Sequence, residues 1–322
     1  MRDMEKISNH RISVVHIILF FVVVIAGMVW LMLGGVLPPL AQSDPLPHIL
    51  SVIALLVLLS FFAGLISGDY SWTDRLWSTA PIGLAWIYAA ASRWNGVLVF
   101  TAVLVTLWGL RLTFNFARRG GYSGEEDYRW PILKARINQP VLWQLFNLVF
   151  IAGYQHFLFI CFTIPLYVMY LQSQQTTLCL ATQGPLFWVA SAAALFFLII
   201  ETVADQQQWN FQQRKARVSS DHPDRRRGFC VTGLFRRSRH PNYLGELGVW
   251  WSIFAMGAVV IGTPLHWTVA GPVLLTLLFM GSTWFTEGIT SSRYPDYKKY
   301  QKGTWGIVPR PGRPLSWDGE NS

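Results

Sequence analysis

The sequence predicts an all-α protein, a polytopic membrane helical bundle with seven or eight transmembrane helices. Of its 322 residues, 52% are hydrophobic and only 13% are charged, and the mean hydropathy is +0.34. This composition differs from that of a water-soluble domain or a disordered chain. Eight apolar runs qualify as candidate spans by length and hydropathy; they fall at about 13–37, 49–67, 76–93, 95–115, 142–171, 185–204, 242–263 and 267–286.

The first run follows a basic start, which could indicate a signal peptide. The apolar stretch continues from Ile12 to Leu37 without a clear small-residue cleavage site, so we expect a retained span. We therefore assign 1–48 to an additional N-terminal transmembrane helix and loop, 49–311 to the main membrane domain, and 312–322 to a polar tail.

Two of the later runs are unusual. The third, 76–93, is short and polar at its start. The fifth, 142–171, is long and carries Gly153 and His156 in its middle, so we expect it to be kinked or strongly tilted. His156 is interpreted as a satisfied core histidine rather than a ligand.

Charge in the connecting segments orients the helices. Lys and Arg gather in alternate segments, 118–136, 205–241 and the tail from Arg293, whereas 38–48 and 172–184 have none. Basic loops stay on the cytoplasmic side, so both termini are predicted to be cytoplasmic. The net charge of +9 is thus explained by orientation and local anion sites, not by nucleic-acid binding.

The stretch from Arg236 to Glu246 joins the most basic loop to the seventh run. Pro241 can begin a helix, because its missing N–H would be unpaired in the first turn. Asn242 and Glu246 then lie on one helix face. A carboxylate inside a spanning helix is costly unless it is paired or hydrated, so Glu246 predicts an anionic-cofactor site at the membrane surface, with arginines nearby.

Other ionisable residues lie near the same predicted side of the membrane. Arg111 is either a snorkelling side chain or a site residue. Glu201 and Asp205 are four residues apart at the end of the sixth run, where we favour a polar ligand site over a solvated helix end. Asp74 and its neighbour Arg75 either pair at the interface or face the cofactor.

Basic and aromatic residues alternate in the tail from Arg293 through Tyr294 to Tyr300. This pattern indicates contact with lipid headgroups or a segment that folds over the site at His240, and both interpretations stay open. The sixteen Trp residues suit interfacial belts and an apolar ligand.

Several kinds of site are excluded by missing motifs. The sequence has no G-x-G-x-x-G after a strand, no P-loop and no G-x-S-x-G. The three cysteines are isolated and no second His stands at metal-ligand spacing, so neither a disulfide framework nor a metal site is expected.

A family resemblance rests on the string from Gly233 to Glu246, with Ser238-Arg239-His240-Pro241-Asn242-Tyr243-Leu244-Gly245-Glu246 at its centre, and on Trp250-Trp251. Ser71 to Ser78, Glu201 to Asp205, Tyr294-Pro295-Asp296-Tyr297 and Pro309-Arg310-Pro311 also match. Over about 50–311, the chain resembles the steroid 5α-reductase superfamily (3-oxo-5α-steroid 4-dehydrogenase C-terminal-like), in a bacterial branch of uncharacterised multi-pass proteins.

The resemblance implies a membrane-embedded, NADPH-dependent oxidoreductase acting on CH–CH groups, which reduces a carbon–carbon double bond in a lipid or steroid-like enone. It also implies a bacterial inner membrane and an apolar substrate that enters from the lipid bilayer. The residues expected to bind the cofactor are Arg111, Arg118, Arg119, Glu201, Asp205, Arg239, His240, Asn242, Tyr243, Glu246 and Tyr294. Asn242 and Glu246 would hold the nicotinamide end, and arginines would bind the phosphates.

The catalytic acid departs from the family pattern. Steroid reductases polarise the substrate carbonyl with a Glu and a Tyr, and the matching positions here, near Ser78 and Trp108, carry neither. We therefore expect Asp74, Tyr122 or Tyr154 to act as the proton donor.

Two alternatives remain. Isoprenylcysteine carboxyl methyltransferases and phospholipid methyltransferases share Arg-His-Pro-x-Tyr and a Tyr-x-x-Tyr tail, and they use S-adenosylmethionine. The basic 214–239 loop and the carboxylates at Glu201 and Asp205 favour the reductase. The second alternative is a non-enzymatic membrane protein whose polar helix ends only fix its topology.

Overall fold

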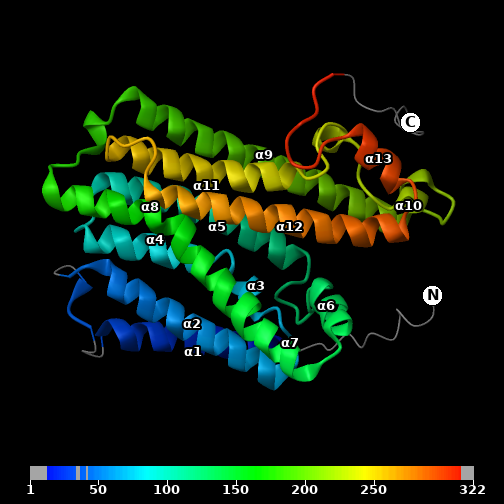
Figure 1. Cartoon of the computed structure of the whole chain (residues 1–322), viewed down its shortest axis with the longest axis horizontal. Helices are drawn as coiled ribbons and strands as arrows, with labels where there is room; N and C mark the ends of the chain where they lie inside the picture. The colour runs from blue at the N-terminus through cyan, green and yellow to red at the C-terminus, as the bar shows by residue number, and fades with distance from the viewer. Residues whose placement is uncertain (1–12, 34–36, 41–42, 313–322) are drawn as a thin grey trace. The chain divides into compact units, whose positions relative to one another are not determined.

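The computed structural model describes residues 13–33, 37–40 and 43–312, and the first two apolar runs become helices there. Helix α1 spans Val14–Leu33 and α2 spans Pro45–Ser67, drawn in blue in Figure 1. The Asp44 carboxylate accepts the Leu46 N–H at 2.8 Å and caps α2, which ends at Gly68 with φ of 71°. Residues 1–12 and, apart from Gly312, the predicted tail 312–322 lie outside these ranges.

The third run, 76–93, forms the short helix α4 (Ala80–Ala91), which follows the five-residue helix α3 (Trp72–Leu76) and precedes α5 (Gly96–Arg118). Helix α4 packs antiparallel to α5: the Ser78 and Thr113 hydroxyls lie 2.7 Å apart, and the Trp86 indole N–H donates to the Thr106 hydroxyl at 3.0 Å. Leu84, Ala85, Tyr88 and Ala89 on α4 are fully buried. This helix is therefore a core element, although it is shorter than a typical span.

The fifth run changes its hydrogen-bond pattern in the middle, near the predicted kink. After α6 (Arg129–Ile137), α7 covers Pro140–Phe146, a π-helical segment η2 covers Asn147–Tyr154, and α8 covers Gln155–Gln175. A π-segment inside a helix is a known cause of bending. His156 is fully buried and its Nδ1 lies 2.7 Å from the Ala152 carbonyl oxygen.

The remaining helices form the second half of the chain. A short 3₁₀ turn η3 (Leu180–Thr182) precedes α9 (Pro185–Arg217), which is followed by α10 (Pro223–Arg227), η4 (Gly233–Arg236) and α11 (Pro241–Val260). Then come η5 (Trp267–Val269), α12 (Ala270–Arg293) and α13 (Tyr297–Gly303). Helix α9 has 33 residues and is about 50 Å long, so it exceeds the roughly 30 Å hydrocarbon core of a bilayer.

The protein is all-helical and carries, within the described ranges, seven helices long and apolar enough to cross a membrane. This finding confirms the predicted fold class. The seven are Val14–Leu33, Pro45–Ser67, Gly96–Arg118, Pro140–Gln175, Pro185–Arg217, Pro241–Val260 and Trp267–Arg293. The one predicted span that is not among these seven, the third run at 76–93, corresponds to the short helix α4.

The chain divides into two compact units. The first comprises the described residues up to Pro185 together with Met256–Gly271, and the second comprises Leu186–Ala255 and the described residues from Pro272 onward. The first unit therefore holds α1 to α8, and the second holds α9, most of α11 and α12, and α13. The candidate site residues fall in both units.

Candidate functional site

In the second unit, α11 packs closely on α9 through two glycines. A Cβ atom added at Gly245 would lie 2.5 Å from the Glu201 Cβ, and one at Gly248 would lie 2.1 Å from the Phe197 ring. Gly245 and Gly248 are three residues apart and share one face of α11. Only glycine allows the two backbones to approach this closely, so this contact fixes the position of Glu201 beside the first turns of α11.

Three carboxylates are buried around this contact. Glu201, Asp205 and Glu246 expose only 3%, 4% and 4% of their surface. Glu201 and Asp205 follow one another along a face of α9, and Glu246 is adjacent to the glycine that touches Glu201. Burying three acids in a spanning bundle is costly, and the structure buries all three on α9 and α11, the two helices that meet at this contact.

Asn242 and Tyr243 lie half-buried in the first turn of α11. The Tyr243 ring stacks on the His240 ring, with centroids 5.0 Å apart and an interplanar angle of 16°. Its other neighbour is Phe279 of α12, which it meets edge-on at 4.6 Å. Helix α11 thus presents Asn242, Tyr243 and Glu246 close to the loop that precedes it.

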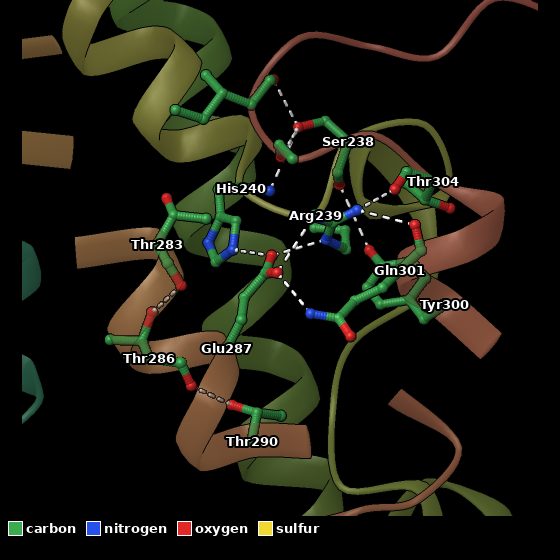
Figure 2. A network of polar contacts seen from close by, with 12 residues as sticks. Ser238, Arg239, His240, Thr283, Thr286, Glu287, Thr290, Tyr300, Gln301 and Thr304 are labelled. Atoms are coloured by element: carbon green, nitrogen blue, oxygen red, sulfur yellow. Dashed lines mark hydrogen bonds and ion pairs between the residues drawn. The ribbon is translucent and has the colours of Figure 1, made fainter. Parts of the chain in front are cut away.

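That loop is bound to α12 by Glu287, a residue that the sequence analysis did not select (Figure 2). The Glu287 carboxylate accepts hydrogen bonds from Arg239 Nε at 2.6 Å and Arg239 Nη2 at 3.1 Å. It also lies 2.8 Å from His240 Nε2 and accepts from Gln301 Nε2 at 2.8 Å. Glu287 exposes 6% of its surface, so this is a largely buried, charge-assisted network.

The signal that could have identified Glu287 was present in the sequence. It is the only acidic residue of α12 and follows directly after the predicted span 267–286. An isolated acid at the end of an apolar helix needs a cationic partner, and Arg239 was already a candidate. Pairing the two was not possible from the sequence, because they are 48 residues apart.

Arg239 also joins the tail to the same loop. Its guanidinium donates to the backbone oxygens of Gln301, at 3.2 Å, and of Thr304. The backbone N–H groups of Arg239 and His240 donate to Trp305 and Gly306, both at 2.9 Å. The tail therefore folds over the His240 segment, which is one of the two interpretations left open by the sequence. The guanidinium donors that were expected to bind a phosphate have protein partners here.

Tyr294 lies just beyond α12 and covers Gly228. A Cβ at Gly228, whose φ is 79°, would lie 2.1 Å from the Tyr294 ring. The guanidinium carbon of Arg293 lies 5.5 Å from the centroid of the same ring. Tyr294 thus packs against the basic loop between α9 and α11, and its predicted role in cofactor binding stays a prediction.

The first unit contains a separate polar cluster around α3. Asp69 and Arg75 form a fully buried ion pair at 2.7 Å. The Arg75 Nε donates to the Gly121 carbonyl at 3.1 Å, and the Glu126 carboxylate accepts the Tyr70 N–H at 2.8 Å. These bonds attach the loop after α5 to the segment before α4.

Asp74 belongs to the same cluster. Its carboxylate accepts from the Trp130 indole N–H at 2.6 Å and pairs with Arg129 at 3.4 Å. Burial raises the pKa of Asp74 to about 6, although Arg129 opposes the shift. Burial also raises the pKa of Glu126 to about 7. Two acids of this cluster thus titrate near neutral pH, and the sequence indicated only Asp74.

The two candidate tyrosines occupy different positions in the first unit. The Tyr122 hydroxyl donates to the Arg75 carbonyl at 3.0 Å, so Tyr122 lies beside the segment that carries Asp74. Burial raises the Tyr122 pKa above its ordinary value. The Tyr154 ring instead stacks on Phe150 at 5.5 Å on the π-helical segment. The structure brings Tyr122, but not Tyr154, to the Asp74 cluster.

The three arginines of α5 and its end lie in this unit as well. Arg118 donates from Nε and Nη2 to the Asn115 side-chain oxygen at 3.0 and 2.8 Å. Arg111 is half-buried and Arg119 is exposed. Their expected contact with cofactor phosphates stays a prediction.

Comparison with known proteins identifies the family. The family model described as "Protein of unknown function (DUF1295)" matches residues 60–304. The chain belongs to the DUF1295 family. This family is steroid 5α-reductase-like. A relative, "Uncharacterized protein C594.04c" of Schizosaccharomyces pombe, is 34% identical over 281 residues, covering 79% of this chain and 78% of the relative. No solved structure matches the chain.

Proposed function

We propose that this DUF1295 protein is a membrane-embedded, NADPH-dependent reductase of a carbon–carbon double bond in a lipid or steroid-like enone. The observation that carries the proposal is the burial of three carboxylates, Glu201, Asp205 and Glu246, on the two helices that meet where Gly245 touches Glu201. Membership of a steroid reductase-like family of membrane proteins supports the reaction class.

The residues at this contact fit one end of the cofactor. Carboxylates accept hydrogen bonds from amide N–H groups and ribose hydroxyls, so Glu246, Glu201 and Asp205 suit the nicotinamide amide and the riboses, with Asn242 beside them. NADPH supplies the hydride when it is bound. The exposed Arg236 and Arg237 on the adjoining loop suit its phosphates.

A proton must also reach the substrate, and Asp74 is our first candidate for its donor. Its raised pKa of about 6 leaves part of the Asp74 population protonated near neutral pH, as a general acid requires. Tyr122 lies beside the same segment and is the second candidate. Tyr154 is the third candidate for the proton donor.

The proposed orientation has both termini in the cytoplasm of a bacterial inner membrane. The basic segments 118–136 and 205–241 are separated by two spans and therefore lie on one side of the bilayer, but the N-terminus lies on that side too only if α4 also crosses. The buried, core position of α4 supports such a crossing. An apolar substrate would then enter from the lipid.

One observation favours the S-adenosylmethionine-dependent methyltransferase as a second candidate. The Arg239 guanidinium is hydrogen-bonded to Glu287, Gln301 and Thr304. These bonds use the donors that were expected to bind a cofactor phosphate. A cofactor without a diphosphate needs fewer cations at its site.

Thermal unfolding of the full chain in detergent separates these proposals. Binding to the native state raises the midpoint, so we expect a shift with NADPH and none with S-adenosylmethionine. Glu246→Gln and Asn242→Ala should reduce the NADPH shift, whereas Glu125→Gln, an exposed loop acid, should not. A shift with S-adenosylmethionine alone would favour the methyltransferase, and no shift with either would favour a non-enzymatic protein.

The reaction itself is tested by incubating the protein with labelled NADPH and a lipid extract. Mass spectrometry should reveal an apolar product heavier by two hydrogens. If NADPH binds and no product gains hydrogen, the reductase assignment fails although the cofactor site stands.

A further inference from the structure

Helix α13 has two faces of opposite character. Its inner face carries Tyr297 and Tyr300, which expose 5% and 1% of their surface and pack on Phe229 at 4.9 and 5.3 Å between ring centroids. The Tyr300 hydroxyl donates to the Phe235 carbonyl. This face holds α13 in place on the second unit, and it leaves Lys298, Lys299 and Lys302 exposed.

The outer face is basic and concave. A surface cavity of about 460 Å³ is lined by Lys298, Lys299, Lys302, Gly303 and Arg310. Arg310 is fixed there, because its backbone N–H donates to the Arg237 carbonyl at 2.7 Å and its Nη1 donates to the Lys302 carbonyl at 3.1 Å. The cavity is therefore built by two chain segments that are bonded to one another, not by scattered surface lysines.

Little negative charge opposes this cavity within its own segment. Between Arg293 and Gly312 the chain carries five Lys and Arg residues and a single acid, Asp296. Four positively charged side chains around one concavity attract a negatively charged phosphate, for which Lys is a common ligand. Arg239, which faces α12, is bound to Glu287.

The cavity also lies close to the expected bilayer surface. Helix α12, a candidate span, ends at Arg293, and α13 begins four residues later at Tyr297. Trp305 and Val308 in the same tail are 51% and 58% exposed. Exposed Trp beside basic residues at the end of a span is typical of the interface between lipid and water.

We propose that Lys298, Lys299, Lys302 and Arg310 form a binding site for the phosphate of an anionic phospholipid headgroup. Its four side chains differ from those proposed to bind the cofactor, although Arg310 is hydrogen-bonded to the backbone of Arg237. It joins the two interpretations of the tail: the aromatic face of α13 covers the His240 segment, and the basic face binds the membrane surface.

Binding of short-chain lipids to the full-length protein in detergent tests the site. Native mass spectrometry should detect dihexanoyl-phosphatidylglycerol bound in preference to dihexanoyl-phosphatidylcholine, whose choline neutralises the phosphate. The variant Lys298→Gln/Lys302→Gln should weaken phosphatidylglycerol binding about 30-fold, or about fivefold for each lysine. The charge-matched control Arg225→Gln/Arg226→Gln, two exposed positions on α10, should retain it.

Three results would overturn the proposal. One is equal phosphatidylglycerol binding by the lysine variant and the wild type. Another is full displacement by equimolar inorganic phosphate, which would indicate a free-anion site. The third is loss of NADPH binding with lipid binding intact, which would assign the cavity to the nucleotide. The thermal midpoint of the double variant shows whether it folds. If it does not, Lys302→Gln alone replaces it, and this single variant should bind phosphatidylglycerol about fivefold more weakly than the wild type.

Discussion

Glu287→Gln is the sharpest test of the buried network that joins α12, the His240 segment and the tail. The substitution keeps the shape of the side chain but removes the charge that faces Arg239 and His240. The new amide group can accept at one oxygen only, and its NH₂ would face a guanidinium or amide donor. A buried donor is therefore left unsatisfied beside an unpaired cation.

The expected loss of folding stability in Glu287→Gln follows from the contacts of this carboxylate. Removing one partner of a buried ion pair costs about 3–5 kcal/mol. The Arg239 and His240 side chains are 13% and 16% exposed, so water can partly replace the lost acceptor and we expect the lower end, about 3 kcal/mol. At roughly 2–4 °C per kcal/mol, the thermal midpoint should fall by about 6–12 °C.

The assay is thermal unfolding of the full chain in detergent, paired with limited proteolysis. The tail should become cleavable between Tyr297 and Gly312, because Arg239 and Gln301 no longer share an acceptor. Asp296→Asn is the matched control: it also removes one negative charge, but from an exposed side chain without a capping hydrogen bond. A midpoint for Glu287→Gln within about 1 °C of the Asp296→Asn midpoint would refute the reasoning, since exposed substitutions usually change stability by less than about 0.5 kcal/mol.

Three further outcomes are expected from thermal unfolding. Gly245→Ala should destabilise the protein because its Cβ would lie 2.5 Å from that of Glu201, whereas Gly288→Ala, with open space around it, should stabilise α12 by up to about 1 kcal/mol; equal effects would contradict the close α9–α11 contact. Arg75→Met should cost about 3–5 kcal/mol because it leaves a fully buried carboxylate unpaired, and a loss below 1 kcal/mol would exclude a buried pair. Because burial raises the pKa of Glu126 to about 7, the folded state holds its proton more tightly than the unfolded state, and the stability this provides is lost as pH rises from about 4.5 through 7. The midpoint of Glu126→Gln minus that of wild type should therefore increase between pH 5 and pH 8, and a constant difference would contradict the burial of this acid.

The sequence predicted most of the helices because hydropathy alone decides whether a long run can span a bilayer. The runs at 95–115 and 185–204 became Gly96–Arg118 and Pro185–Arg217. The helices continue past the predicted ends because polar residues such as Gln208 and Gln212 support a helix in water as well as apolar ones. Hydropathy detects the membrane, not the end of the helix.

The candidate site was predicted less completely. Glu201, Asp205 and Glu246 were found because an acid in an apolar run is conspicuous at any position. Glu287 and Glu126 were missed because their roles depend on partners 48 and 56 residues away. The second role of Arg239 was missed for the same reason: a cation in a sequence looks available, and only the fold reveals which acid it already binds.

The folded tail has a consequence for biosynthesis. Ser238, Arg239 and His240 obtain hydrogen-bond acceptors from Thr304, Trp305, Gly306 and Ile307. The ribosome makes those acceptors more than sixty residues later, so α11 is inserted while its basic entrance is still unsatisfied. Until synthesis has passed Ile307, these donors can bind only water or other groups, and a premature stop before that point would leave an inserted α11 without its contacts to the tail.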